Sequence, residues 1–133
     1  PAEYAAKLTL APDSVIAFDD AQQPAGFLLA ARGTALAALG AEPLAHMLRH
    51  PPESYLLIDQ IAVAPNARAR GLAQQLLDAA IRSACPRIAG ASIMHEPVRN
   101  LRSLRFFTEK NGFSLALSYR EKDFEWGHYE RVY

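Results

Sequence analysis

The chain has 133 residues, of which 50% are hydrophobic and 21% are charged, a composition typical of an ordinary globular protein. Its 14 basic and 14 acidic residues give a formal net charge of zero, so a broad electrostatic attraction to nucleic acid or to an anionic membrane is not expected. This length accommodates one core, and residues 1–133 are therefore expected to form a single domain.

The 133-residue sequence shows no pattern typical of a membrane span or of a signal peptide. No apolar run approaches the ~20 residues needed to cross a bilayer. Cys85 is the lone cysteine and has no partner for an internal disulfide, which fits a reducing compartment, so we expect a soluble cytoplasmic protein. A single cysteine can also act as a nucleophile, but the position of Cys85 beside Pro86, at the end of a predicted helix, favours a structural role.

The first elements are short. Residues 2–8 are rich in alanine and are interpreted as the end of a helix. Residues 14–18 and 25–32 are interpreted as two strands joined by a polar turn, which predicts an antiparallel hairpin.

Residues 34–54 form a less regular segment that favours one or two helical turns and ends at Pro51 and Pro52. His46 and His50 are four residues apart and could face one another on a helix. Because two histidines alone rarely make a metal site, solvated surface is the favoured interpretation and no metal is expected.

The pattern from Tyr55 onwards alternates strands and helices. Apolar runs predict strands at 55–63, 87–96, 113–119 and 123–133, and helical periodicity predicts helices after Gly71 and over 99–111. Asn111 and Gly112 are typical of a left-handed helix end. This succession predicts a layered α/β sheet with crossover connections.

The junction after strand 55–63 is suited to binding a phosphate. Small residues keep this turn free of bulk, and the following helix begins with amide N–H groups that lack intrahelical partners. Arg68 and Arg70 add positive charge, and a Cβ at Gly71 would hold the backbone away from phosphate oxygens. Spacing alone leaves open a plain helix start with two solvated arginines, because the Walker lysine and the Gly-x-Gly-x-x-Gly series are absent.

Two motifs resemble the signatures of the GNAT superfamily of N-acetyltransferases. The first signature is a strand that ends in Val-x-Pro, followed by a helix that opens with (Arg/Gln)-x-x-Gly-x-(Gly/Ala). In this chain it reads Val63-Ala64-Pro65 and then Arg68-Ala69-Arg70-Gly71-Leu72-Ala73. The second signature is matched by Asn100, Ser103, Phe106-Phe107 and Glu109-Lys110-Asn111-Gly112-Phe113. Together the motifs cover about half of the chain, and their combination is far more specific than either motif alone.

The resemblance implies a mixed central sheet flanked by helices, in which two neighbouring parallel strands splay apart to hold acyl-CoA. Pantetheine would pair with the backbone of Ile61, Ala62 and Val63. The pyrophosphate would lie on the loop formed by Arg68, Ala69, Arg70, Gly71, Leu72 and Ala73. Asn100, Ser103 and Phe107 complete the expected acyl-CoA site, and a backbone N–H near residues 61–63 would polarise the thioester carbonyl.

Three features depart from the family pattern. The tyrosine that often protonates the departing thiolate corresponds to Phe107 when counted from Asn100 and to Thr108 when counted back from Gly112, because this helix holds one extra residue. The family's first strand and first helix are expected to be absent or truncated here. Residues 34–54 replace what is usually a short hairpin.

Three residues are candidates for the base that an amine nucleophile requires. Asp59 occupies a position where some family members carry a catalytic glutamate, and a carboxylate within an apolar strand is expected to be partly desolvated and so a stronger base. His95 and Glu96 stand at the carboxyl end of the next strand, where open α/β sheets bind ligands. Trp126, Tyr129 and Tyr133 are interpreted as core or homodimer contacts.

These features predict an enzyme that transfers an acyl group, most simply acetyl, from acetyl-CoA to a primary amine by direct attack. Its expected partners are acyl-CoA and the amine, without nucleic acid, membrane or metal. A catalytically inactive acyl-CoA-binding module for regulation or assembly is the alternative, favoured by the unassigned general acid. A nucleotide-phosphate binder unrelated to CoA is disfavoured by the second motif.

Overall fold

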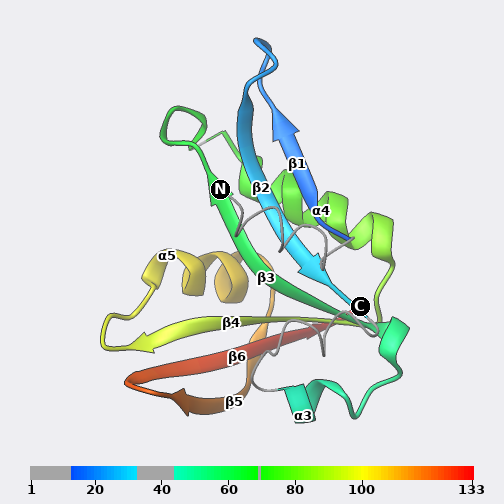
Figure 1. Ribbon diagram of the computed structural model, residues 1–133, viewed down its shortest axis with the longest axis vertical. Helices are drawn as coiled ribbons and strands as arrows, with labels where there is room; N and C mark the ends of the chain where they lie inside the picture. The colour runs from blue at the N-terminus through cyan, green and yellow to red at the C-terminus, as the bar shows by residue number, and fades with distance from the viewer. Residues whose placement is uncertain (1–12, 33–43, 69) are drawn as a thin grey trace.

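A six-stranded mixed sheet organises the molecule (Figure 1). The structure is a computed structural model that describes residues 13–32, 44–68 and 70–133. The strands lie in the order β1-β2-β3-β4-β6-β5. Their bounds are β1 Val15–Phe18, β2 Pro24–Ala31, β3 Tyr55–Val63, β4 Ile88–Glu96, β5 Ser114–Glu121 and β6 Phe124–Val132. Only β3 and β4 pair in parallel, so the predicted mixed α/β sheet is confirmed.

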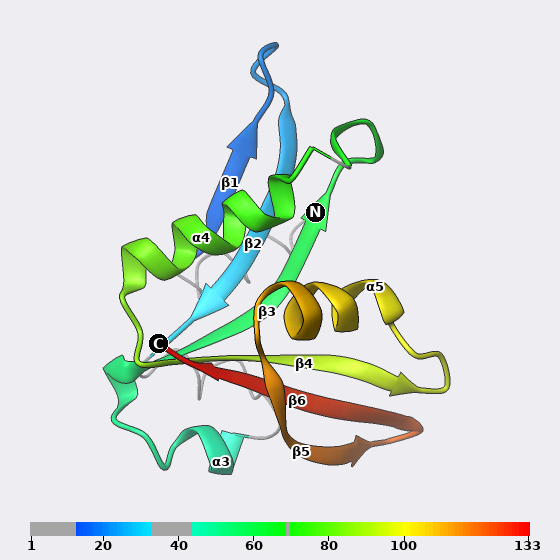
Figure 2. The ribbon, with the colours of Figure 1, turned by 180° about the vertical axis from the view of Figure 1, so that it is seen from behind.

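Helices cover both faces of this sheet. The helices are α3 Leu44–Met47, α4 Leu72–Ala84 and α5 Leu101–Leu104, and a π-helix over Arg105–Lys110 continues α5. α4 lies across the β1–β3 half, and α5 lies alongside β4 on the same side (Figure 2). None of the helices in the described ranges is long and apolar enough to cross a membrane. The predicted helix at residues 2–8, and the part of segment 34–54 before Leu44, lie outside the described residues.

The main core lies between the sheet and α4. Leu76, Leu77 and Ala80 recur at helical spacing and are almost completely buried against β2 and β3. Phe107 and Phe113 extend this core beneath the π-helix, with their ring centroids 5.0 Å apart. The apolar stripe seen in the sequence therefore fixes which face of α4 meets the sheet.

The parallel strands β3 and β4 separate halfway along their length. Their pairing runs from Tyr55 opposite Ile88 to Ile58 opposite Ala91 and then stops, although both strands continue. On the other edge of β3, Leu29 pairs with Gln60 and Ala30 pairs with Ile58, so Asp59 is an extra residue in a β-bulge. Because a bulge bends its strand, Asp59 marks the point where β3 turns away from β4.

The sequence predicted one helix over 99–111, and the structure differs in that only its first part is a regular α-helix. After one turn of α5 the chain widens into the π-helix, a geometry that accommodates one extra residue within a helix. The extra residue counted between Asn100 and Gly112 is thereby absorbed, and Gly112 ends the segment at φ +71°, confirming the left-handed helix end.

Candidate functional site

The separation of β3 and β4 opens a cleft of about 1060 Å³. One wall is the outer half of β3, the other is the matching half of β4, and the N-terminal ends of α4 and α5 close the two sides. Nearly all of the residues expected from the two family motifs line this space. The matched residues along its walls are Ile61, Ala62, Val63, Arg68, Gly71, Leu72, Ala73, Asn100, Ser103 and Phe107.

The start of α4 presents backbone donors without intrahelical partners to the cleft. Gly71 is the N-cap residue at φ +73°, a conformation that glycine adopts without steric cost, and it supplies no capping side chain. Gln75 N–H is the first amide to bond back, to the carbonyl of Gly71, so the amides of residues 72–74 lack intrahelical acceptors. These donors and the positive end of the helix dipole suit an anion.

Both arginines of the loop are exposed at this position. Arg68 Nε lies 3.4 Å from the carbonyl oxygen of Val63, which keeps this side chain close to the end of β3. Arg70 directly precedes Gly71, whereas Ala69 lies outside the described residues. In the described part of the loop, positive side-chain charge therefore stands beside amides that lack intrahelical acceptors, a combination that suits an anion.

Asn100 caps α5 at the mouth of the cleft. Its side-chain oxygen accepts a hydrogen bond from the Ser103 amide at 3.1 Å, the geometry of an N-cap. Its NH₂ group is therefore the part of the side chain that remains available as a donor. Phe107 is buried at 5% exposure, so it packs beneath the cleft.

Neither position aligned with the family's tyrosine carries a free acid. Phe107 has no ionisable group, and the Thr108 hydroxyl donates to the carbonyl oxygen of Leu104 at 2.6 Å. Hydroxyl groups bonded back into the preceding turn of a helix are held away from ligands. The general acid expected of the family is thus missing from both positions.

A pair of side-chain amides joins the two helices that flank the cleft. Gln74 Nε2 donates to Asn111 Oδ1 at 2.7 Å, while Asn111 Nδ2 donates to Gln74 Oε1 at 3.0 Å. Asn111 is 5% exposed and also donates to the carbonyl of Phe106. The pair fixes the start of α4 against the end of the π-helix, a link between distant residues that no local pattern reveals.

Polar groups gather where β3 leaves β4. The Asp59 side chain lines the cleft but is exposed, so the desolvation expected from its place in an apolar strand is absent. Gln60 Oε1 and Trp126 Nε1 are buried atoms without a hydrogen-bond partner in the described part of the chain, and both residues line the cleft. Because unpaired buried polar atoms are costly, these two atoms are natural contacts for a ligand.

Trp126 had been interpreted as a core or dimer contact, and its place on the cleft wall is a feature that sequence reasoning missed. It lies on β6 opposite Met94 of β4, which brings it to the cleft from the far end of the chain. Tyr129 fits the core interpretation, since it is 8% exposed and burial raises the pKa of its phenol.

His95 and Glu96 lie beyond the residues that line the cleft. His95 is 8% exposed, with Nε2 2.8 Å from the Tyr129 hydroxyl and Nδ1 3.6 Å from Glu125 Oε1. Glu96 is exposed and lies 3.3 Å from Arg120 Nη1. The structure brings Asp59 into the cleft and places the other two candidate bases outside it.

A buried polar network stands behind the β4 wall. Ser92, which lines the cleft, places its hydroxyl 2.9 Å from Nδ1 of His128, and Nε2 of His128 lies 2.6 Å from the Tyr55 hydroxyl. The Tyr55 hydroxyl in turn donates to Glu130. Burial lowers the pKa of fully buried His128 to about 4, so its ring is neutral near pH 7.

This network fixes the direction of each hydrogen bond. Since the Tyr55 proton goes to Glu130, Tyr55 can only accept from Nε2–H of His128, which leaves Nδ1 to accept the Ser92 proton. Burial and Glu130 raise the pKa of Tyr55, which therefore stays protonated. For Glu130, burial raises the pKa, but the hydrogen bonds from Tyr55 and His46 and the electrostatic effect of His46 lower it by more, so the net shift is downward. Ser92 is thus oriented as a hydrogen-bond acceptor toward the cleft.

Comparison with protein families identifies the class to which this architecture belongs. The model described as the acetyltransferase (GNAT) family matches residues 2–113. This chain belongs to that family, as the two motifs had predicted. The comparison with curated protein sequences gives no match.

Solved structures share the fold at low sequence identity. PH1933 from Pyrococcus horikoshii OT3 superposes with a TM-score of 0.72 at 11% identity, over 99% of this chain and 73% of that one. Chaetomium thermophilum Naa20, solved with a bisubstrate analogue, gives 0.66 at 16% identity, over 98% and 72% of the two chains. Nourseothricin acetyltransferase gives 0.62 at 16% identity, over 91% of this chain and 66% of that chain, so the present chain spans about two thirds of its length.

Proposed function

We propose that this chain transfers an acetyl or other acyl group from acyl-CoA to a primary amine by direct attack within a ternary complex. One observation supports this function best. The place where β3 and β4 separate and the N-terminus of α4 border the same cleft. Acetyl-CoA, when bound, supplies the activated thioester.

The α4 side of the cleft fits the anionic part of acyl-CoA. The amides of residues 72–74 would donate to pyrophosphate oxygens, with Arg68 and Arg70 balancing the charge. Beyond Ile58 the β4-facing edge of β3 is unpaired, so its backbone can hydrogen-bond an extended pantetheine arm as a further strand would. Asn100 would add a side-chain donor to this arm.

The β4 side fits an amine. The free acceptor Gln60 Oε1 and the oriented oxygen of Ser92 can each accept a hydrogen bond from an amine N–H. We assign to Asp59, the candidate base that lines the cleft, the role of accepting the proton that the amine loses before attack. His95 and Glu96 are further candidates for this base. A β3 amide near Ile61 to Val63 would stabilise the developing oxyanion as the new N–C bond forms and the C–S bond breaks.

The second candidate is an acyl-CoA-binding module without catalysis. It is favoured by the missing acid, since Phe107 is apolar and Thr108 is bonded to the backbone. The loop and the β3 edge would serve both functions equally. The two functions differ only in whether bound acyl-CoA reacts with an amine.

Initial-rate kinetics separate these alternatives. Thiol release from acetyl-CoA should rise in the presence of a panel of amines, and double-reciprocal plots against both substrates should intersect, as expected for a ternary complex. Parallel lines would contradict direct attack. Calorimetric acetyl-CoA binding without amine-dependent thiol release across the panel would establish the binding module instead.

A further inference from the structure

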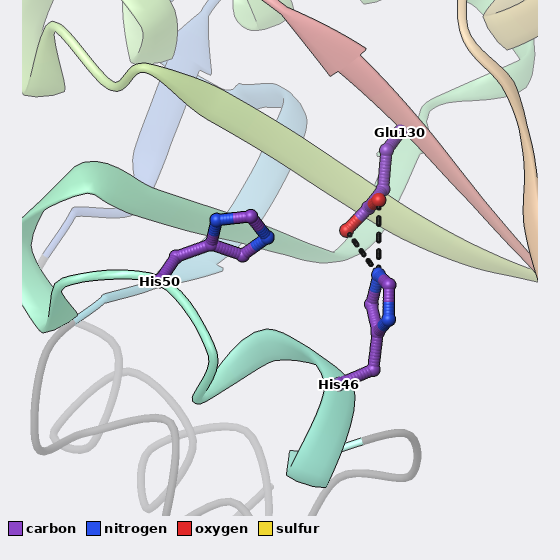
Figure 3. Close-up of side chains that lie close together, drawn as sticks. All are labelled: His46, His50 and Glu130. Carbon is purple, nitrogen blue, oxygen red and sulfur yellow. Dashed lines mark hydrogen bonds and ion pairs between the residues drawn. The ribbon is translucent and has the colours of Figure 1, made fainter.

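A second cluster of polar side chains lies on the sheet face opposite α4 and α5. Side chains alternate between faces along β6, so Glu130 points away from the core face that Tyr129 occupies. His46 of α3 and His50 of the following turn converge on this carboxylate (Figure 3). The three residues each offer one ligand atom, and all of these atoms lie within 4.8 Å of one another.

We propose that His46, His50 and Glu130 bind a divalent transition-metal ion of the zinc type. Two imidazoles and one carboxylate form a donor set suited to Zn²⁺ and chemically similar ions, whereas Mg²⁺ and Ca²⁺ prefer oxygen ligands alone. A fourth coordination position remains for water or another ligand.

The spacing of the donors matches a tetrahedral site. Metal–ligand distances of about 2.1 Å place neighbouring ligand atoms roughly 3.4 Å apart. His46 Nε2 is 3.1 Å from both Oε1 and Oε2 of Glu130 and is already at this spacing. Since the ligand atoms all lie within 4.8 Å of one another, a side-chain movement of at most about 1.4 Å would bring His50 to the same distance.

The local backbone places both imidazoles on one side of the α3 segment. His46 and His50 are four residues apart, and turn hydrogen bonds from Arg49 to His46 and from His50 to Met47 continue the curvature of α3 beyond its last residue. Met47 is fully buried and anchors the segment to the protein. The histidine pair judged from sequence to be solvated surface is thus partly buried and directed at a carboxylate.

Neighbouring side chains hold the donors in place. The Tyr55 hydroxyl donates to Oε2 of Glu130 and leaves Oε1 for the ion. The same Tyr55 ring stacks on the His50 ring, with centroids 5.5 Å apart and planes inclined by 26°. Outer-shell hydrogen bonds and packing of this kind orient metal ligands. The side chains of His46 and Glu130 keep 26% and 16% of their surface exposed, so an ion can reach them.

Bound metal would tie the α3 segment to β6. None of the three ligands lines the acyl-CoA cleft, and Glu130 is linked to it through the hydrogen bonds of Tyr55, His128 and Ser92. The competing interpretation is a simple histidine–carboxylate pair between His46 and Glu130 that binds no ion.

Cobalt titration of the EDTA-dialysed full chain tests the site, because Co²⁺ bound by nitrogen and oxygen ligands gives a visible absorption band. The experiment uses a Cys85→Ser background, since the exposed thiol of Cys85 could bind Co²⁺ itself. We expect one equivalent of Co²⁺ with a Kd of about 10 µM or tighter, displacement by Zn²⁺, and a metal-dependent rise in Tm. Absence of binding at ~100 µM Co²⁺ would overturn the proposal.

His50→Gln is the decisive variant, because it removes one ligand and leaves the His46–Glu130 pair intact. It should weaken Co²⁺ binding at least about tenfold, and Glu130→Gln should do the same. The matched controls His95→Gln and Glu125→Gln change the same residue types outside the cluster and should bind Co²⁺ normally. Circular dichroism confirms that each variant is folded. Unchanged Co²⁺ affinity in folded His50→Gln would show that the cluster is only an ion pair.

Discussion

The Ser92 hydroxyl oxygen lies 2.9 Å from Nδ1 of His128 and donates its proton to that neutral, fully buried ring. The lone pairs of Ser92 are then left to face a donor in the cleft. We expect Ser92→Ala to raise the KM for the amine by about 3- to 10-fold, the value of one neutral hydrogen bond, while the Kd for acetyl-CoA stays unchanged.

Ser92→Thr retains the hydroxyl and is the matched variant for this prediction. It should keep most of the amine affinity if the oxygen is the relevant group. Steady-state kinetics with both substrates varied give the KM values, and calorimetry gives the Kd for acetyl-CoA. If Ser92→Ala weakened only acetyl-CoA binding and left the KM for the amine unchanged, Ser92 would contact acetyl-CoA and not the amine.

Gly71 tests the phosphate-binding role of the α4 N-terminus. Gly71→Glu adds bulk and negative charge beside the free amides of residues 72–74 and should abolish detectable acetyl-CoA binding. Any side chain at φ +73° lowers the stability of the fold by about 1–2 kcal/mol through backbone strain. The variant must therefore be compared with Gly71→Gln, which carries the same strain without the charge. We expect the glutamate variant to bind acetyl-CoA at least about tenfold more weakly than the glutamine variant. Equal calorimetric affinities in the two variants would argue against an anion at this position.

Asn100 has an observed role in capping α5 and a proposed role in binding pantetheine, and two substitutions separate them. Asn100→Ala should cost ~1 kcal/mol of unfolding free energy, because the Ser103 amide loses its acceptor. Asn100→Ser restores a capping oxygen but cannot supply the amide donor, so it should recover stability and still weaken acetyl-CoA binding. Urea denaturation and calorimetry measure the two quantities. Normal acetyl-CoA affinity in Asn100→Ser would leave the cap as the side chain's whole role.

The sequence predicted the parts of this fold that have a local cause. The apolar stripe of α4, the strand that ends at Val63 and the left-handed Gly112 all follow from patterns within a few residues. The extra residue between Asn100 and Gly112 could be counted, but its accommodation as a π-helix depends on packing against the sheet. Local patterns therefore predicted the elements and the residues that line the α4 side of the cleft.

Contacts between distant residues could not be predicted in this way. The Gln74–Asn111 pair spans 37 positions, and the approach of His46 to Glu130 spans 84. Trp126 reaches the cleft only because β6 inserts between β4 and β5 in the sheet order. Even the exposure of Asp59 results from a bulge that its apolar neighbours do not signal.

The proton chemistry of the proposed reaction places unequal demands on the protein. An alkyl-ammonium with a pKa of about 10 is almost entirely protonated at neutral pH, so its deprotonation needs a base. A departing thiolate with a pKa of about 8.5 can leave with little protonation or take a proton from water. Loss of the family's tyrosine should therefore be tolerated, whereas loss of the base should not.

We accordingly expect Thr108→Ala, which removes a hydroxyl already bonded to the Leu104 carbonyl, to lower kcat by less than about tenfold. Asp59→Asn is nearly isosteric and should lower kcat by ~10²-fold or more and remove the acidic limb of the pH–rate profile. Asp123→Asn, an exposed aspartate at the turn between β5 and β6, is the matched control and should leave both unchanged. If Asp59→Asn retains its rate and its acidic limb, the base lies elsewhere, and His95→Gln is the next variant to measure, because the imidazole of His95 stands near the end of the β4 wall.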